Sequence, residues 1–279
     1  MKILDCRPLA REEEKWIKAQ IDLHPTHRPP CLVVIADGTD PASQIYVKQK
    51  FKAAERCGIH ALYWKVSNQE ELVSAVDTAN KADYIDGIII QQPCLGLSFA
   101  YLRELVSPNK DVDGFCESSY FLPCTPHGII ELLHAFGYNL KGQHCVVLGR
   151  SEIVGKPLAS MLLEHDATVS VCHSRTPNEV RKTLLKNADF IFSCVGKAGL
   201  IKPEDVKDDV VIVDVGITRQ EDGKICGDAG PAEIWTDTNV ALTPVPGGVG
   251  PMTVTMLMQH TYDAWRIRLL REEDNAIST

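Results

Sequence analysis

The segment Cys145-Val-Val-Leu-Gly-Arg-Ser-Glu-Ile-Val-Gly-Lys-Pro157 decides the fold class of this chain. Its first four residues are apolar and have the length of a buried strand, and a glycine-bearing turn then leads into a helical pattern. Gly149 permits a tight turn, Gly155 permits close backbone approach, and the helix end presents N–H groups and partial positive charge to an anion. This layout is typical of a dinucleotide-binding domain. Because the spacing is not G-x-G-x-x-G, a purely structural strand-to-helix turn is the alternative.

Strand-like and helix-like segments alternate along the rest of the chain, which predicts an α/β protein with parallel sheets covered by helices. In the first half we expect strands at 31–36, 61–66 and 85–90 and helices at about 11–23, 41–57, 69–81 and 99–106. In the second half we expect a helix after Pro126, strands at 144–149, 168–172, 189–195 and 210–215, and an apolar helix from Met252 onward. The second series predicts a doubly wound sheet. The turn-rich stretch 107–114 places a domain boundary near Ser118.

Composition and charge exclude several classes of protein. The net charge of −8 does not supply the basic face that binding to nucleic acid needs. The N-terminus lacks a basic segment followed by a long apolar run, so we expect neither a secretory signal nor a membrane span, and a cytoplasmic protein or one in an organelle lumen. The ten cysteines are scattered without a C-x-x-C pair, and the nine histidines show no metal-ligand spacing. We therefore expect reduced cysteines and no metal.

The residues after the second strand of the nucleotide domain favour NADP over NAD. In the NAD fingerprint an acidic residue at this place binds the ribose hydroxyl. Here the place is taken by His173-Ser174-Arg175, and a carboxylate is absent from it. Arg175, Ser174 and Arg150 can bind a ribose phosphate through charge-assisted hydrogen bonds, whereas the alternative is that these are solvated surface arginines.

Tyr46 and Lys50 are candidates for a reaction site in the first half of the chain. They lie four residues apart in a predicted helix, so their side chains share one face. Gln91 follows the predicted strand 85–90, at the end of a strand where ligands of open α/β sheets collect. Asp113 precedes a glycine in a loop, where a carboxylate is either a turn residue or an acceptor for a ligand's N–H groups. Taken alone, Tyr46 and Lys50 also fit an ordinary surface pair on an amphipathic helix.

With these residues in place, the chain resembles the bifunctional methylenetetrahydrofolate dehydrogenase and methenyltetrahydrofolate cyclohydrolase family. The matching blocks occur in the family's order over nearly the whole chain: Pro41-Ala-Ser-Gln-Ile-Tyr-Val-Lys-Gln-Lys-Phe-Lys-Ala53, Lys110-Asp-Val-Asp-Gly114, Pro123-Cys-Thr-Pro126, Gly149 to Pro157, Cys172-His-Ser-Arg-Thr176 and Thr243-Pro-Val-Pro-Gly-Gly-Val-Gly-Pro-Met-Thr253.

The resemblance implies a fold of two domains with a cleft between them. These are an N-terminal catalytic and folate domain, residues 1–118, and a Rossmann NADP-binding domain, residues 119–251, with the C-terminal helix 252–279 joined to the first domain. It also implies a homodimer. The implied reaction oxidises methylenetetrahydrofolate with NADP to the methenyl form, which is then hydrolysed to formyltetrahydrofolate.

The resemblance also implies roles for individual residues. Lys50 is the implied catalytic lysine, Tyr46 stacks on the folate, Gln91 adjusts Lys50, and Asp113 anchors the pterin. The implied NADP contacts are Gly149, Arg150, Ser151, Ser174, Arg175 and Ile217, and the implied folate-side loop includes Pro246, Gly247 and Gly248.

Some residues depart from the family pattern, and other functions compete with this one. Gln92 and Cys94 stand where the family usually has leucines, which we expect to put polar groups near the folate pocket; Ala36 and Ala229 also depart. The competing hypotheses are a family member with one activity, another two-domain NADP oxidoreductase acting on a small hydroxy acid or shikimate, and a catalytically silent regulator. The intact set of Tyr46, Lys50, Gln91 and Asp113 argues against the last.

Overall fold

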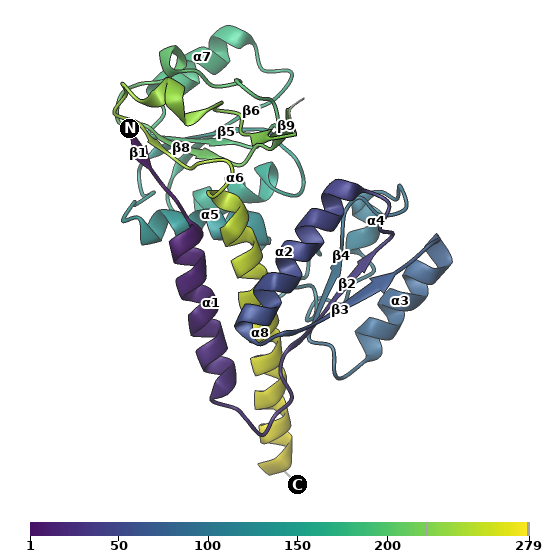
Figure 1. Ribbon diagram of the computed structural model, residues 1–279. Coiled ribbons are helices and arrows are strands. Elements are labelled where there is room, and N and C mark those ends of the chain that lie inside the picture. Colours follow the sequence, from purple (N-terminus) through teal and green to yellow (C-terminus); the bar gives the residue numbers. More distant parts are fainter. Residues whose placement is uncertain (221–222, 278–279) are drawn as a thin grey trace. The chain divides into compact units, whose positions relative to one another are not determined.

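The computed structural model describes residues 1–220 and 223–277, which form two compact units. The six-stranded unit contains residues 1–10 and 125–253, and the three-stranded unit contains residues 11–124 and the described residues from 254 onward. Figure 1 shows the elements of each unit. Among the described residues, no helix combines the length and the apolar character that crossing a membrane requires.

The six-stranded unit is built on a sheet with the strand order β1-β11-β8-β7-β5-β6, in which every neighbouring pair is parallel. The strands are β1 (Lys2–Ile3), β5 (His144–Leu148), β6 (Thr168–Cys172), β7 (Phe190–Ser193), β8 (Val211–Asp214) and β11 (Ala241–Leu242). Helices α5 (Cys124–Ala135) and α6 (Gly155–Glu164) lie on one face of the sheet, and α7 (Asn178–Asn187) lies on the other (Figure 1). The smaller elements are β9 (Thr218–Arg219), β10 (Ile225–Cys226), η1 (Pro203–Asp205) and η2 (Ala232–Trp235).

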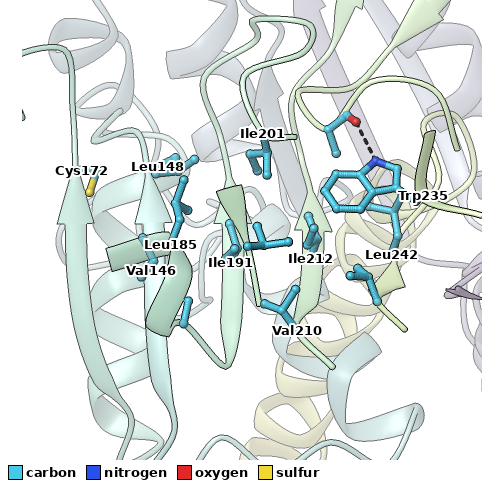
Figure 2. Packing of buried hydrophobic residues seen from close by; sticks show 14 residues of the cluster. Val146, Leu148, Cys172, Leu185, Ile191, Ile201, Val210, Ile212, Trp235 and Leu242 are labelled. Carbon is cyan, nitrogen blue, oxygen red and sulfur yellow. Dashed lines mark hydrogen bonds between the residues drawn. The ribbon is translucent and has the colours of Figure 1, made fainter. Parts of the chain in front are cut away.

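The core of this unit forms where buried strand residues meet α7 and the loops after it. Val146, Ile191 and Ile212 come from three neighbouring strands and pack with Leu185 of α7, all at most 1% exposed (Figure 2). Trp235 is fully buried at one end of the cluster, and its indole N–H donates to the Ala229 carbonyl at 2.9 Å. Because the sheet is covered on both faces, its central strands are continuous apolar runs, which explains why they are recognisable in the sequence.

The three-stranded unit contains the parallel sheet β3-β2-β4, formed by β3 (His60–Lys65), β2 (Cys31–Ala36) and β4 (Gly87–Ile90). Its helices are α1 (Arg7–Asp22), α2 (Pro41–Cys57), α3 (Gln69–Lys81), α4 (Phe99–Arg103) and α8 (Val249–Ile277), of which α1 and α8 begin in residues of the six-stranded unit. Alternate residues of β2 and β4 pack with α3 and α4 in one apolar cluster. Figure 1 shows α2 on the opposite face of the sheet.

Local sequence signals explain how α2 is held in place. Asp40 caps its first turn by accepting a hydrogen bond from the Ser43 N–H at 2.7 Å, and Pro41 occupies the first helical position, where its missing N–H has no cost. Gly58 ends the helix in the left-handed conformation, with φ of 75°. Because α2 begins only a few residues after β2 ends at Ala36, its start lies near the carboxyl end of β2.

The structure confirms the predicted α/β class, and α2 and α3 have the predicted bounds. The compact units differ from the expected domain ranges at two places. Residues 1–10, expected in the N-terminal domain, belong to the six-stranded unit, because β1 extends that sheet by pairing with β11. The division between the units falls at Cys124 and Thr125 rather than near Ser118. Helix α8 begins at Val249, three residues before Met252.

Candidate active site

The turn between β5 and α6 is closely packed around its two glycines. Gly149 has φ of 110°, and a Cβ there would lie 2.8 Å from the Cys194 carbonyl oxygen. A Cβ at Gly155 would lie 2.5 Å from the Gly149 carbonyl oxygen. The Ser151 hydroxyl accepts hydrogen bonds from the N–H groups of Val154 and Gly155, at 3.2 and 3.3 Å, and so closes the turn. Only glycine fits at both places, as a backbone surface that meets a dinucleotide phosphate requires.

The loop after β6 lies beside this turn, because β5 and β6 are paired up to Leu148 and Cys172. His173 shapes the loop: its N–H donates to the Thr176 hydroxyl at 3.0 Å, and its Nδ1 accepts from the Arg175 N–H at 3.1 Å. Ser174 and Arg175 are exposed at its tip, as is Arg150 after β5. The two sequence segments predicted to bind the adenosine ribose phosphate therefore follow neighbouring strand ends.

A pair of buried aspartates holds the loops after β7 and β8. The Asp228 carboxylate accepts hydrogen bonds from the Ser193 hydroxyl and from the N–H groups of residues 195–197, at 2.6 to 3.3 Å. Asp214 accepts hydrogen bonds from the N–H groups of Gly216, Asp228 and Ala229. Burial raises the pKa of Asp214 to about 6, although these hydrogen bonds oppose the shift. Ile217, three residues after Asp214 and the end of β8, is 44% exposed.

The glycines after β11 are required by contacts inside the six-stranded unit. Gly247 has φ of 112°, and its carbonyl accepts a hydrogen bond from the Cys6 N–H at 3.0 Å. A Cβ at Gly248 would lie 2.7 Å from the Pro244 carbonyl oxygen. The loop that contains Pro246 comes directly after β11, so it begins at the same edge of the parallel sheet as the turn after β5.

The three-stranded unit brings Lys50 and Gln91 together. The Lys50 Nζ donates to Gln91 Oε1 at 2.9 Å, and the Gln91 Nε2 donates to the Gln92 carbonyl at 3.0 Å. The second bond fixes the amide so that its oxygen faces the lysine. The Gln91 N–H donates to the Ile35 carbonyl at 2.8 Å, which ties the residue to the end of β2. These bonds place a lysine amine at the carboxyl end of β4.

Asp113, a half-buried residue, lies close to the same amine. Burial raises the pKa of Asp113, and the positive charge of Lys50 and a hydrogen bond from Cys124 act in the opposite direction. Cys124 in turn donates to the Val112 carbonyl at 3.2 Å and lies 3.5 Å from His260 Nδ1. Neither Cys124 nor His260 was among the predicted site residues, although Cys124 lies in the family-like segment Pro123-Cys-Thr-Pro126.

Tyr46 and Cys94 differ in their exposure to solvent near Lys50 and Gln91. Tyr46 lies one turn before Lys50 on α2 and is 38% exposed. Cys94 is fully buried in the apolar cluster under α3 and α4, and the expectation that it adds a polar group to the folate pocket is wrong. Its thiol behaves as a small apolar side chain that fills the core.

Each unit therefore has a distinctive group of residues. Glycine-based turns and exposed basic residues lie at the carboxyl edge of the six-stranded parallel sheet, as in dinucleotide-binding domains, and a lysine amine, a glutamine amide and an aspartate lie close together in the three-stranded unit. Together they are the parts of a nicotinamide-dependent oxidoreductase.

Comparisons with known proteins agree with this class. Residues 4–113 match the model of the tetrahydrofolate dehydrogenase/cyclohydrolase catalytic domain, and residues 123–269 match that of its NAD(P)-binding domain. The bifunctional protein FolD of Staphylococcus epidermidis (strain ATCC 35984) is 43% identical over 281 residues, covering 96% of this chain and 97% of its own.

Two solved structures are similar over nearly the whole chain. The bifunctional FolD of Campylobacter jejuni has a TM-score of 0.90 at 39% identity, covering 96% of this chain and 99% of its own. FolD of Trypanosoma brucei, complexed with NADP cofactor and inhibitor, has a TM-score of 0.87 at 30% identity, covering 95% and 97%. The chain therefore belongs to the tetrahydrofolate dehydrogenase/cyclohydrolase family. The predicted family, the two-domain fold, the nicotinamide cofactor and the pair of activities are confirmed.

Proposed function

We propose that this enzyme oxidises methylenetetrahydrofolate with NADP and hydrolyses the methenyl product to formyltetrahydrofolate, with Lys50 as the acid and base of the hydrolysis. The observation that carries the assignment is the hydrogen bond between Lys50 Nζ and the oriented Gln91 amide, with the half-buried Asp113 close to the same amine. These three groups come from three separate segments of one unit.

The hydrolysis needs one group that moves a proton twice. Water adds to the methenyl carbon and loses a proton, and the bond from that carbon to one of the two folate nitrogens breaks as this nitrogen gains a proton. In its neutral form the Lys50 amine accepts the first proton, and as ammonium it supplies the second. Gln91 Oε1 accepts a hydrogen bond from Lys50 and so holds the amine at the end of β4. Gln91 is thus a positioning residue.

Asp113 and Tyr46 hold the substrate in this proposal. When ionised, the Asp113 carboxylate accepts hydrogen bonds from N–H groups of the pterin ring, and its buried setting strengthens such bonds. The Tyr46 ring, exposed on the same helix as Lys50, stacks on an aromatic part of the folate. Both contacts orient the one-carbon bridge, which is what hydride transfer mainly requires of the protein.

The residues at the edge of the six-stranded sheet fit NADP. The tight turn at Gly149 and Gly155 leads into the N-terminus of α6, whose N–H groups favour a phosphate, while Arg150, Ser174 and Arg175 hold the ribose phosphate. Ser151 and Ile217 complete the cofactor contacts, and the loop containing Pro246, Gly247 and Gly248 contacts the folate. When bound, NADP accepts the hydride in the first step.

Absorbance assays test the role of Lys50. Wild type, Lys50→Met and the control Lys15→Met, an exposed lysine of α1, are mixed with methylenetetrahydrofolate and NADP, and separately with methenyltetrahydrofolate alone. Wild type and control should reduce NADP and should hydrolyse the methenyl species faster than buffer does. We expect Lys50→Met to lose at least 100-fold in hydrolysis, the lower end of the contribution of general acid–base catalysis.

Two outcomes would contradict the proposal in different ways. Hydrolysis by Lys50→Met at the control rate would remove the lysine from the mechanism. Absence of both signals in wild type would remove the folate assignment itself.

We also propose a cytoplasmic homodimer, in which the three-stranded unit is the catalytic domain and the six-stranded unit is the cofactor domain. The ten unpaired cysteines support a reducing compartment. The edge strand β6 exposes Val171, 41% accessible, which supports an interface on the six-stranded unit. A monomer in sedimentation at micromolar concentration would contradict the dimer.

A further inference from the structure

A pocket lies between α2 and the edge strand β3 of the three-stranded unit. Its volume is about 600 Å³, within the range of roughly 300 to 1,000 Å³ that is usual for small-molecule sites. The lining residues are Ala36, Gly38, Ser43, Gln44, Val47, Lys48, Phe51, Lys52, Tyr63 and Lys65. Neither Tyr46 nor Lys50 is among them, because those side chains leave α2 on another side.

The pocket combines apolar walls with positive charge. Val47 and Phe51 of α2 are half-buried along one wall, and the Tyr63 ring of β3 lies in the opposite wall. Among the residues that the structure describes, the charged side chains lining the pocket are those of Lys48, Lys52 and Lys65, and none is acidic. A ligand that fits these walls has an apolar, ring-sized body and negative charge.

The three lysines converge for simple geometric reasons. Lys48 and Lys52 are four residues apart on α2 and so lie on one side of the helix. Tyr63 and Lys65 are two residues apart on β3 and so point to the same face of the sheet. Gly38 keeps the space between the walls open, since a Cβ there would lie 3.0 Å from the Tyr63 hydroxyl.

Within residues 1–220 and 223–277, none of these three ammonium groups forms an ion pair with a carboxylate. Asp37 is near Lys65 but is already used: its oxygens accept hydrogen bonds from the N–H groups of Thr39 and Leu95, at 2.9 and 2.7 Å. Burial raises the pKa of Asp37, but those bonds and the Lys65 charge outweigh it and lower the pKa. All three lysines are exposed at the pocket, so an anion bound there can reach their ammonium groups.

We propose that this pocket binds a small organic anion that carries an apolar ring and two or three carboxylate or phosphate groups. Two sources offer this chemistry: the carboxylate-bearing end of the folate substrate, which rests on the proposed function, and a separate small anion that occupies the pocket alone. The lysines supply charge complementarity in both cases, and salt weakens binding in both.

Benzene-1,3,5-tricarboxylate, a ring with three carboxylates, is the probe, and benzyl alcohol is the uncharged comparison. Titration calorimetry on wild type, Lys48→Gln/Lys65→Gln and the control Lys15→Gln measures their affinities. We expect the tricarboxylate to bind wild type and control equally, the double variant at least tenfold more weakly, and benzyl alcohol without detectable heat. Failure of the tricarboxylate to bind wild type at 10 mM, or equal binding to all three proteins, would overturn the proposal.

Steady-state kinetics separates the two sources. If the substrate's own carboxylates occupy the pocket, the double variant has a raised KM for methylenetetrahydrofolate at unchanged kcat, and the tricarboxylate competes with the folate. If a separate anion occupies it, KM stays unchanged and the tricarboxylate does not compete. Because calorimetry needs no turnover, an inactive wild type would contradict the proposed function and leave the pocket measurement intact.

Discussion

Replacing Asp228 with alanine tests whether one buried carboxylate holds the loop after β7. In the wild type this side chain is fully buried and accepts four hydrogen bonds. The Ser193 hydroxyl, also fully buried, would lose its partner at a cost of about 1–3 kcal/mol. The donors of residues 195–197 belong to an exposed loop, so water can replace the carboxylate there at a smaller cost each.

Burial is the main cause of the raised pKa of Asp214, and repulsion from the Asp228 carboxylate adds to it. Removing that carboxylate relieves the repulsion and offsets a part of this loss. Together these contributions give a destabilisation of about 3 kcal/mol. A protein of this size changes its melting temperature by roughly 2–4 °C per kcal/mol, so we expect a decrease of about 6–12 °C.

Thermal unfolding followed by circular dichroism measures the effect, with Asp237→Ala as the control. Asp237 is an exposed aspartate of the same unit, and its replacement should shift the melting temperature by less than about 2 °C. A melting temperature for Asp228→Ala within that same margin of wild type would refute the claim that its four hydrogen bonds hold the loop.

Three further predictions concern separate parts of the molecule. Gly114→Ala should destabilise the protein by more than about 3 kcal/mol in urea unfolding, because the new Cβ would lie 2.3 Å from a backbone carbonyl, whereas Gly142→Ala, at nearly the same φ with open space, should cost about 1–2 kcal/mol; equal costs would contradict this. Asp214 has a raised pKa of about 6, so the folded state binds its proton more tightly than the unfolded state. As the pH rises from 4 to 6, the unfolding free energy of wild type should therefore fall by about 2 kcal/mol more than that of Asp214→Asn; parallel curves would exclude the raised pKa. The double variant Arg150→Ala/Ser174→Ala should bind NADP at least tenfold more weakly in calorimetry and NAD nearly as wild type, and equal weakening would rule out the ribose-phosphate assignment.

The sequence alone determined the class of the fold and the kind of reaction. Apolar runs such as Cys145-Val-Val-Leu148 can be recognised because strands covered on both faces must be apolar along their whole length. Asp40, Pro41 and Gly58 mark the ends of α2 because capping and positive φ are local requirements. The spacing of Tyr46 and Lys50 likewise depends only on helix geometry.

Tertiary structure decided everything that depends on contacts between distant segments. The sequence did not reveal that residues 1–10 belong to the six-stranded unit, because two-residue strands such as β1 and β11 have too few residues to show a pattern and exist only through their pairing. Cys94 was expected near the folate pocket because it replaces a residue that is usually leucine in the family, and only the fold shows that it packs under α3 and α4.

The same limit applies to the site. Lys50 and Gln91 are 41 residues apart, and the sequence could name both residues without showing the bond that turns the Gln91 oxygen toward the amine. The hydrogen bonds of Asp214 and Asp228 likewise link separate segments of the chain. The three lysines beside α2 also come from two separate segments. Each depends on where chain segments meet in space, and that is set by the packing of the sheets and not by any local pattern of residues.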